Sequence, residues 1–156
     1  MRSLPVRWLL PALLVLLCLT GCKPGTTGTG ALVHCSVSLD RPSPDNGENP
    51  RTIVAGTRFW CDDPGADRLS LTLRLQRQNS KGTWDDAATS SFTVSGSHTV
   101  RTPDQRYQTR TVSVRCESGV FRTVIAGKAS GPHTFAQSYD LTGPSTTDPC
   151  NQRLPF

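Results

Sequence analysis

The chain has 156 residues and a formal net charge of +5, from 17 lysines and arginines against 12 aspartates and glutamates. Its length suits one domain once the two ends are set aside. The basic residues are scattered and form no block of like charge, whereas nucleic-acid-binding proteins carry a clustered basic surface. We therefore expect no nucleic-acid partner.

The first 21 residues have the parts of a secretory signal peptide. Arg2 and Arg7 make the start positive, and Trp8 to Leu19 form an apolar stretch that only Pro11 interrupts. A membrane-spanning helix needs about 20 apolar residues, so this stretch is too short to be one. We predict that residues 1–21 direct the chain to export.

The end of this segment, Leu19-Thr20-Gly21-Cys22, resembles the bacterial lipobox. The resemblance implies that the Cys22 thiol receives a diacylglyceryl group and that the chain is cut before Cys22. Acyl chains form a durable anchor, since each buried CH₂ contributes roughly 0.8 kcal/mol. The expected location is the outer face of a bacterial cell membrane, held there by lipid. The alternative is an ordinary signal peptide and a secreted soluble protein, but its Ala-x-Ala cleavage motif is missing near Cys22.

Residues 22–31 are rich in Gly and Thr, a composition typical of flexible linkers. We predict that this linker joins the lipid anchor to a β-sandwich domain at 32–150, which a C-terminal tail at 151–156 follows.

The sequence contains six cysteines. Cys18 lies in the predicted signal and Cys22 is the predicted lipidation site. The remaining four are enough for two disulfides, as expected for an exported chain: Cys35, Cys61, Cys116 and Cys150.

Two disulfide pairings stay open. If consecutive strands are antiparallel, the start of the first strand lies beside the end of the second, which favours Cys35–Cys61 and, by the same reasoning at the other strands, Cys116–Cys150. The alternative joins Cys61 to Cys116 and Cys35 to Cys150.

Apolar residues recur with a period of two after residue 31. The clearest case is Leu69, Leu71, Leu73 and Leu75, which alternate with polar residues and so share one face of a strand. Further strands are expected at 32–39, 52–61, 107–116, 120–127 and 133–141, with two short ones between 83 and 101. About seven or eight short strands predict an all-β fold, an antiparallel β-sandwich of immunoglobulin-like architecture.

Several connections carry turn signals. Glu117-Ser118-Gly119 fits a short hairpin loop with glycine at a positive φ. The Pro-rich stretch Arg41–Pro50 is expected to be a loop, and the chain after Leu141 is expected to be irregular.

The domain lacks two immunoglobulin hallmarks: the leucine strand contains no Trp, and Tyr107 lies nine residues before Cys116 rather than two. The segments Leu71–Trp84 and Cys116–Thr123, together with the four cysteines, resemble small secreted β-sandwich proteins of actinobacteria. This resemblance implies a fold and a compartment. That group has no established activity, so the resemblance supplies no site residues.

Motifs for catalysis and metal binding are missing. No Gly-x-Ser-x-Gly elbow occurs, and His34, His98 and His133 have no partner at a metal-ligand spacing. The adjacent pairs Asp62-Asp63 and Asp85-Asp86 point to opposite faces if they lie in strands. We expect no enzyme, no metal and no cofactor; a secreted hydrolase is the least favoured reading.

The most suggestive surface is the polar face of the predicted sheet. If the leucine stripe points inward, then Arg68 and Arg74 point outward, and Arg115 does the same on the strand that contains Val112 and Val114. Guanidiniums among hydroxyls can hydrogen-bond the anionic groups of a cell-wall polymer. Trp60 and Trp84 are candidates for stacking on sugars, and the alternative for each is a place in the core.

The expected function is therefore a non-enzymatic binding module of the bacterial envelope. Its partners would be the membrane, through the anchor, and a cell-wall polymer or another envelope protein. The alternative is a structural envelope component without a discrete ligand.

Overall fold

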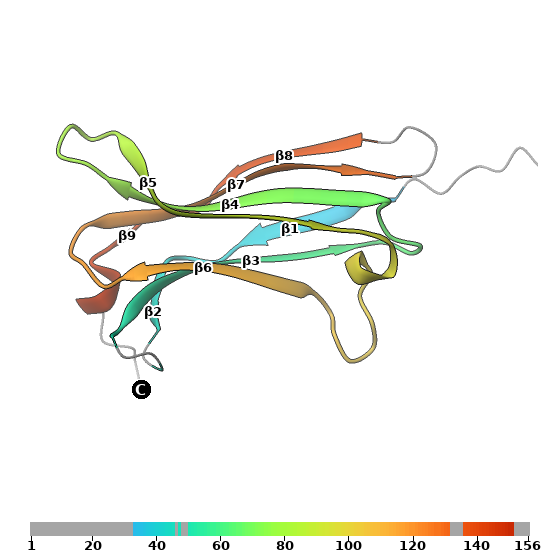
Figure 1. The fold of residues 1–156 in the computed structure, drawn as a ribbon, viewed down its shortest axis with the longest axis horizontal. Coiled ribbons are helices and arrows are strands. Elements are labelled where there is room, and N and C mark those ends of the chain that lie inside the picture. Colours follow the sequence, from blue (N-terminus) through green and yellow to red (C-terminus); the bar gives the residue numbers. More distant parts are fainter. Residues whose placement is uncertain (1–32, 46, 48–49, 132–135, 152–156) are drawn as a thin grey trace, which may run out of the picture.

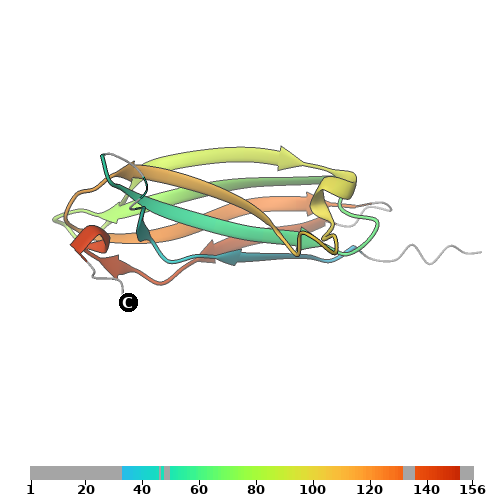
Figure 2. The same cartoon turned by 90° about the horizontal axis from the view of Figure 1, so that it is seen from below.

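The computed structural model describes residues 33–45, 47, 50–131 and 136–151. The predicted signal, Cys22, the whole linker, His133 and residues 152–156 lie outside the described residues. The described part is all-β, with two antiparallel sheets that pack face to face as a β-sandwich (Figure 1). Strands of both sheets run along the long axis of the molecule (Figures 1 and 2).

Sheet A is built around the long strand β3, Thr52–Cys61. One side of β3 pairs with β6, Gln108–Arg115. The other side pairs with two short strands in succession, β1 at Cys35–Leu39 and β2 at Ser43–Asp45.

Sheet B has the strand order β5-β4-β7-β8. Its strands are β5 at Trp84–Val94, β4 at Arg68–Gln78, β7 at Val120–Ser130 and β8 at Ala136–Thr142. A two-residue strand, β9 at Thr146–Thr147, pairs with the start of β7 beyond the end of β8.

The core lies between the two sheets because alternate residues of each strand are apolar. Leu69, Leu71, Leu73 and Leu75 of β4 are all at most 2 % exposed, as the leucine stripe predicts. From sheet A, Ile53, Ala55 and Phe59 face them and are fully buried. The rings of Phe59 and Phe92 stack across the interface with centroids 5.5 Å apart. Removal of these side chains from water is the main term that favours folding.

Two disulfides reinforce the sandwich, Cys35–Cys61 and Cys116–Cys150. These are the two bonds that the antiparallel-strand argument favours. Cys35 and Cys61 are register partners of β1 and β3. Cys150 belongs to a short 3₁₀ turn, η3 at Pro149–Asn151, so its bond ties the end of the described chain to the end of β6.

The prediction of two short strands between residues 83 and 101 is wrong. One strand, β5, continues to Val94, and a 3₁₀ turn, η1 at Gly96–Thr99, follows. The strand ends because Gly96 has a φ of 55°. Its carbonyl packs against the β3–β4 turn, where a Cβ added to Gly65 would lie 2.3 Å from that oxygen. Only glycine fits this close approach, particularly at the Gly65 φ of 96°.

The prediction of a hairpin at Glu117–Gly119 is also wrong. Gly119 does have a positive φ, 146°, but β6 pairs with β3 whereas β7 pairs with β4. The three residues therefore carry the chain from sheet A to sheet B. Two short strands also form where loops were expected: β2 within Arg41–Pro50, and β9 after Leu141. The described part thus has nine strands rather than seven or eight.

Candidate ligand-binding groove

The three arginines of the predicted ligand face do not lie together. Arg68 and Arg74 are on β4 of sheet B, whereas Arg115 is on β6 of sheet A. The leucines of β4 and the valines of β6 point inward as predicted, but they belong to opposite sheets. Arg115 therefore faces away from the two others, and the single surface that the sequence suggested is two surfaces.

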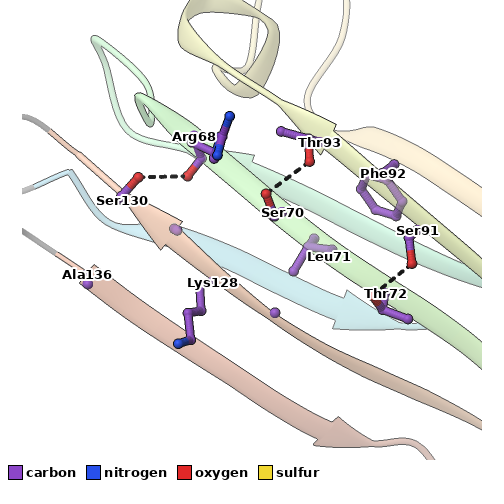
Figure 3. A pocket seen from close by; sticks show the side chains of 12 residues that line it. Arg68, Ser70, Leu71, Thr72, Ser91, Phe92, Thr93, Lys128, Ser130 and Ala136 are labelled. Carbon is purple, nitrogen blue, oxygen red and sulfur yellow. Dashed lines mark hydrogen bonds between the residues drawn. The ribbon is translucent and has the colours of Figure 1, made fainter.

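Arg68 borders a hollow of about 640 Å³ on the outer face of sheet B (Figure 3). Strands β4, β5, β7 and β8 all contribute to it. Its polar lining is Arg68, Ser70, Thr72, Ser91, Thr93, Lys128 and Ser130. The volume falls within the range of roughly 300–1,000 Å³ that is typical of ligand sites.

The surface of sheet B is hollowed here because the side chains on the floor of the groove are short. The register pairs Ser70 with Thr93 on one side and with Lys128 on the other, and it pairs Thr72 with Ser91 and Ala126. Serine, threonine and alanine leave space above the backbone. The long side chains of Arg68 and Lys128 rise from this surface on neighbouring strands.

The hydroxyls of the groove form two pairs across β4 and β5. Ser70 Oγ and Thr93 Oγ1 are 2.9 Å apart, as are Thr72 Oγ1 and Ser91 Oγ (Figure 3). Each pair uses one hydroxyl hydrogen, so the accepting hydroxyl keeps its own hydrogen for another partner. The pairing fixes the hydroxyls in place and leaves one O–H donor in each pair for a ligand.

The groove is positively charged. Its lining includes two cations and, among the described residues, no carboxylate. The described part of the chain contains three ion pairs, Arg58–Asp40, Arg74–Asp86 and Arg77–Glu117. Neither Arg68 nor Lys128 takes part in one, so both charges face the groove without a protein counter-ion among these residues.

Arg74 has a different role. Its Nε lies 3.7 Å from the Asp86 carboxylate, and Gln76 also donates to Asp86. Nearby, the guanidinium of Arg122 lies 4.1 Å from the ring centroid of Trp84 and hydrogen-bonds Gln76. These contacts fix the side chains that make them on the outer face of sheet B, outside the groove lining.

The remaining candidate residues lie apart from the groove lining. His34 and His98 are exposed, and so are Asp62 and Asp63 in the β3–β4 turn. Asp85 accepts a hydrogen bond from Asn79 in the β4–β5 turn. Within the described residues no group of three His, Cys, Asp or Glu side chains is placed to hold a metal ion.

Lys128 is the groove cation that sequence reasoning missed. Its strand reads Val-Phe-Arg-Thr-Val-Ile-Ala-Gly-Lys-Ala-Ser, which lacks the clean alternation of β4. Lys128 meets the groove because β7 pairs with β4, with Lys128 opposite Ser70. No pattern within the strand predicts that long-range pairing.

The chain is thus an antiparallel β-sandwich with two disulfides, bonds typical of proteins in an oxidising, extracellular environment. No helix in the described ranges has the length and apolar character to cross a membrane. Comparisons with protein-family models, curated proteins and solved structures give no match.

Proposed function

We propose that this protein is an exported bacterial lipoprotein, anchored through Cys22, whose β-sandwich binds an anionic polymer of the cell envelope in the groove on sheet B. It acts by binding and not by catalysis. The lipobox supports the anchor, and the disulfides support the exported location. The observation that carries the ligand class is the pair of cations, Arg68 and Lys128, in a lining without a carboxylate and with no ion pair to either cation among the described residues.

Phosphate or carboxylate groups suit this arrangement. Arg68 presents a planar fork that donates two parallel hydrogen bonds to one anionic group, whereas Lys128 acts as a point charge. The free O–H of each hydroxyl pair donates to the same or the next group along the polymer. Because the groove is open, salt screens these attractions, and binding is expected to weaken as ionic strength rises.

The test is retention of the full chain, in detergent, on isolated bacterial cell walls that carry their anionic polymers. Reversing both cations in Arg68→Glu/Lys128→Glu is expected to weaken retention by about tenfold or more, since like charges then oppose the ligand. The matched control is Arg115→Glu/Lys81→Glu, with the same change in net charge on sheet A and in the β4–β5 turn. It should retain wild-type binding.

Cell walls stripped of their anionic polymers give the second arm. Wild-type protein should lose its retention on them. Equal losses in the groove variant and the control would show that net charge alone drives binding. Unchanged retention of the groove variant would favour the structural role without a discrete ligand. Either result rejects the groove as the site.

A further inference from the structure

A second surface lies on the opposite side of the sandwich, at the end where β3 finishes. Trp60 belongs to the outward-pointing set of β3, because Phe59 and Cys61 on either side of it are buried. The register that pairs Phe59 with Gln108 places Tyr107 one residue before β6, next to Trp60. Trp60 pairs with Ser36 of β1 on its other side. Two aromatic rings and a serine therefore lie side by side across sheet A.

An arginine side chain lies against each ring. The guanidinium of Arg101 lies 3.7 Å from the ring centroid of Trp60, and that of Arg58 lies 5.3 Å from the ring centroid of Tyr107. The contacts attach the segment between η1 and β6 to the outer face of sheet A and hold the rings in position. Tyr107 nevertheless remains 43 % exposed, one of the two most exposed large hydrophobic side chains of the described residues.

Tyr107 stands between two hollows. One, of about 160 Å³, is lined by Ser36, Val37, Ser38, Arg58, Trp60 and Tyr107. The other, of about 470 Å³, is lined by Pro103, Asp104, Gln105, Arg106, Tyr107 and Thr109. The first is smaller than the roughly 300–1,000 Å³ of sites for drug-sized molecules, so it fits one ring of a ligand. A ligand that continues past Tyr107 enters the second hollow.

The charges that line the two hollows are balanced, whereas Arg101, which lies against Trp60, lines neither hollow. Arg58 donates to the Asp40 carboxylate, and that hydrogen bond raises the pKa of Arg58. Asp40 lies over Gly56, where an added Cβ would come within 2.8 Å of its carboxylate oxygen. In the second hollow Asp104 accompanies Arg106. This balance contrasts with the two cations of the groove on sheet B, so the ligand class here is neutral.

We propose that the outer face of sheet A, around Trp60 and Tyr107, is a stacking site for a neutral chain of hexopyranose sugars. The C–H face of one sugar stacks on Tyr107, and its hydroxyls meet Ser36, Ser38 and the Asp40–Arg58 pair, which together supply donors and acceptors. The chain crosses Tyr107 from one hollow to the other. This site is independent of the anionic-polymer groove, which lies on the opposite sheet.

The probes are cellotetraose and chitotetraose, mixed with the full chain in detergent and followed by saturation-transfer NMR of the sugar protons. At least one of the two is expected to receive saturation from the wild-type protein. Tyr107→Ala should reduce the transfer at least fivefold. Tyr107→Phe keeps the ring and should keep most of the transfer.

Two further variants separate stacking from general damage. Ser36→Gln leaves both rings in place but fills the smaller hollow, so it should also lose binding. Trp84→Ala is the matched control, because an arginine lies against the Trp84 ring as one does against the Trp60 ring, but Trp84 is on sheet B. This variant should bind the sugar as the wild type does. Thermal unfolding of each variant identifies any loss that is due to misfolding.

The proposal is overturned if neither sugar receives saturation from wild-type protein, or if folded Tyr107→Ala and Ser36→Gln bind as well as wild type. The contacts of Arg101 with Trp60 and of Arg58 with Tyr107 would then contribute to packing and not to a sugar-binding site. Neither result bears on the groove, because the cell-wall assay depends on Arg68 and Lys128. Failure of one site is therefore distinguishable from failure of the other.

Discussion

Tyr139 on β8 donates a hydrogen bond from its Oη to the carbonyl oxygen of Cys35 on β1, at 2.9 Å. The Gln137 side chain adds two more bonds to the same residue: its Nε2 donates to the Cys35 carbonyl, and its Oε1 accepts from the Cys35 N–H. Since β8 belongs to sheet B and β1 to sheet A, side chains join the two sheets at this edge of the sandwich. Cys35 also forms a disulfide with Cys61 of sheet A. Its position is therefore fixed by a covalent bond within sheet A and by hydrogen bonds from sheet B.

This relationship predicts a loss of stability at alkaline pH. Burial raises the pKa of Tyr139 to about 12 from its ordinary value of 10.0. Between these values the unfolded chain releases the phenol proton and the folded chain keeps it, so the free energy of unfolding falls as pH rises. The slope is at most about 1.4 kcal/mol per pH unit from this group.

The variant Tyr139→Phe removes the titration. At pH 7 it should be less stable than wild type by about 1 kcal/mol, the usual contribution of one hydrogen bond. Urea unfolding at pH 7 and pH 10.5 checks both expectations, because the gap between variant and wild type should narrow at the higher pH. A gap that stays constant would show that the pKa of Tyr139 is the same in the folded and the unfolded chain, which would contradict the shift.

Thr99 holds the β3–β4 turn against η1. It is fully buried, and its Oγ1 accepts from the Ala66 N–H at 3.0 Å and donates to the Gly96 carbonyl at 2.7 Å. Thr99→Val keeps the shape but leaves the Ala66 donor without its partner, which should cost about 1–3 kcal/mol in urea unfolding.

Faster hydrogen exchange at the Ala66 amide should accompany that loss. The matched control is Thr111→Val on the outer face of sheet A, where Thr111 is exposed. Its effect should stay within about 0.5 kcal/mol. Equal effects of the two substitutions would contradict the role assigned to Thr99.

The two disulfides should differ in their effect on stability. Sequence separations of 26 and 34 residues predict similar gains from restricting the unfolded chain, about 3–4 kcal/mol each. Cys35 and Cys61 are at most 1 % exposed and belong to the main core, whereas Cys116 and Cys150 are only partly buried. The double variant C35A/C61A should therefore lose about 1–2 kcal/mol more than C116A/C150A, because it also leaves a cavity. Thermal unfolding under non-reducing conditions measures the difference, and a larger loss in C116A/C150A would contradict it.

Local patterns were enough to predict the fold class. The leucines of β4 and the valines of β6 point inward as their alternation requires, and the antiparallel order of consecutive strands favours the two bonds that the structure contains. Alternation states which way a side chain points relative to its own strand. It does not state which sheet the strand joins, and for this reason the local pattern at Glu117–Gly119 predicts a hairpin where the structure has a crossover.

The candidate groove could be predicted only in part for the same reason. Alternation identifies Arg68 as an outward-pointing cation, but its companion, Lys128, is distant in sequence and lies near it only through the pairing of β4 with β7. Alternation also places Arg115 with Arg68, because both are outward-pointing cations on strands with an alternating pattern. The pattern does not state that the two strands belong to opposite sheets, which puts the thickness of the sandwich between these arginines.

The lipid anchor is tested at Cys22, which lies outside the described residues. Expressed in bacteria with labelled palmitate, the wild-type chain should become acylated and remain in the membrane fraction. Cys22→Ser removes the sulfur nucleophile, so the chain should lose the label and accumulate uncleaved. Cys18→Ser, four residues earlier in the apolar stretch, is the matched control and should be labelled and processed as the wild type is. Cleavage and release of Cys22→Ser would instead identify an ordinary signal peptide, and the protein would then meet its ligand as a secreted molecule.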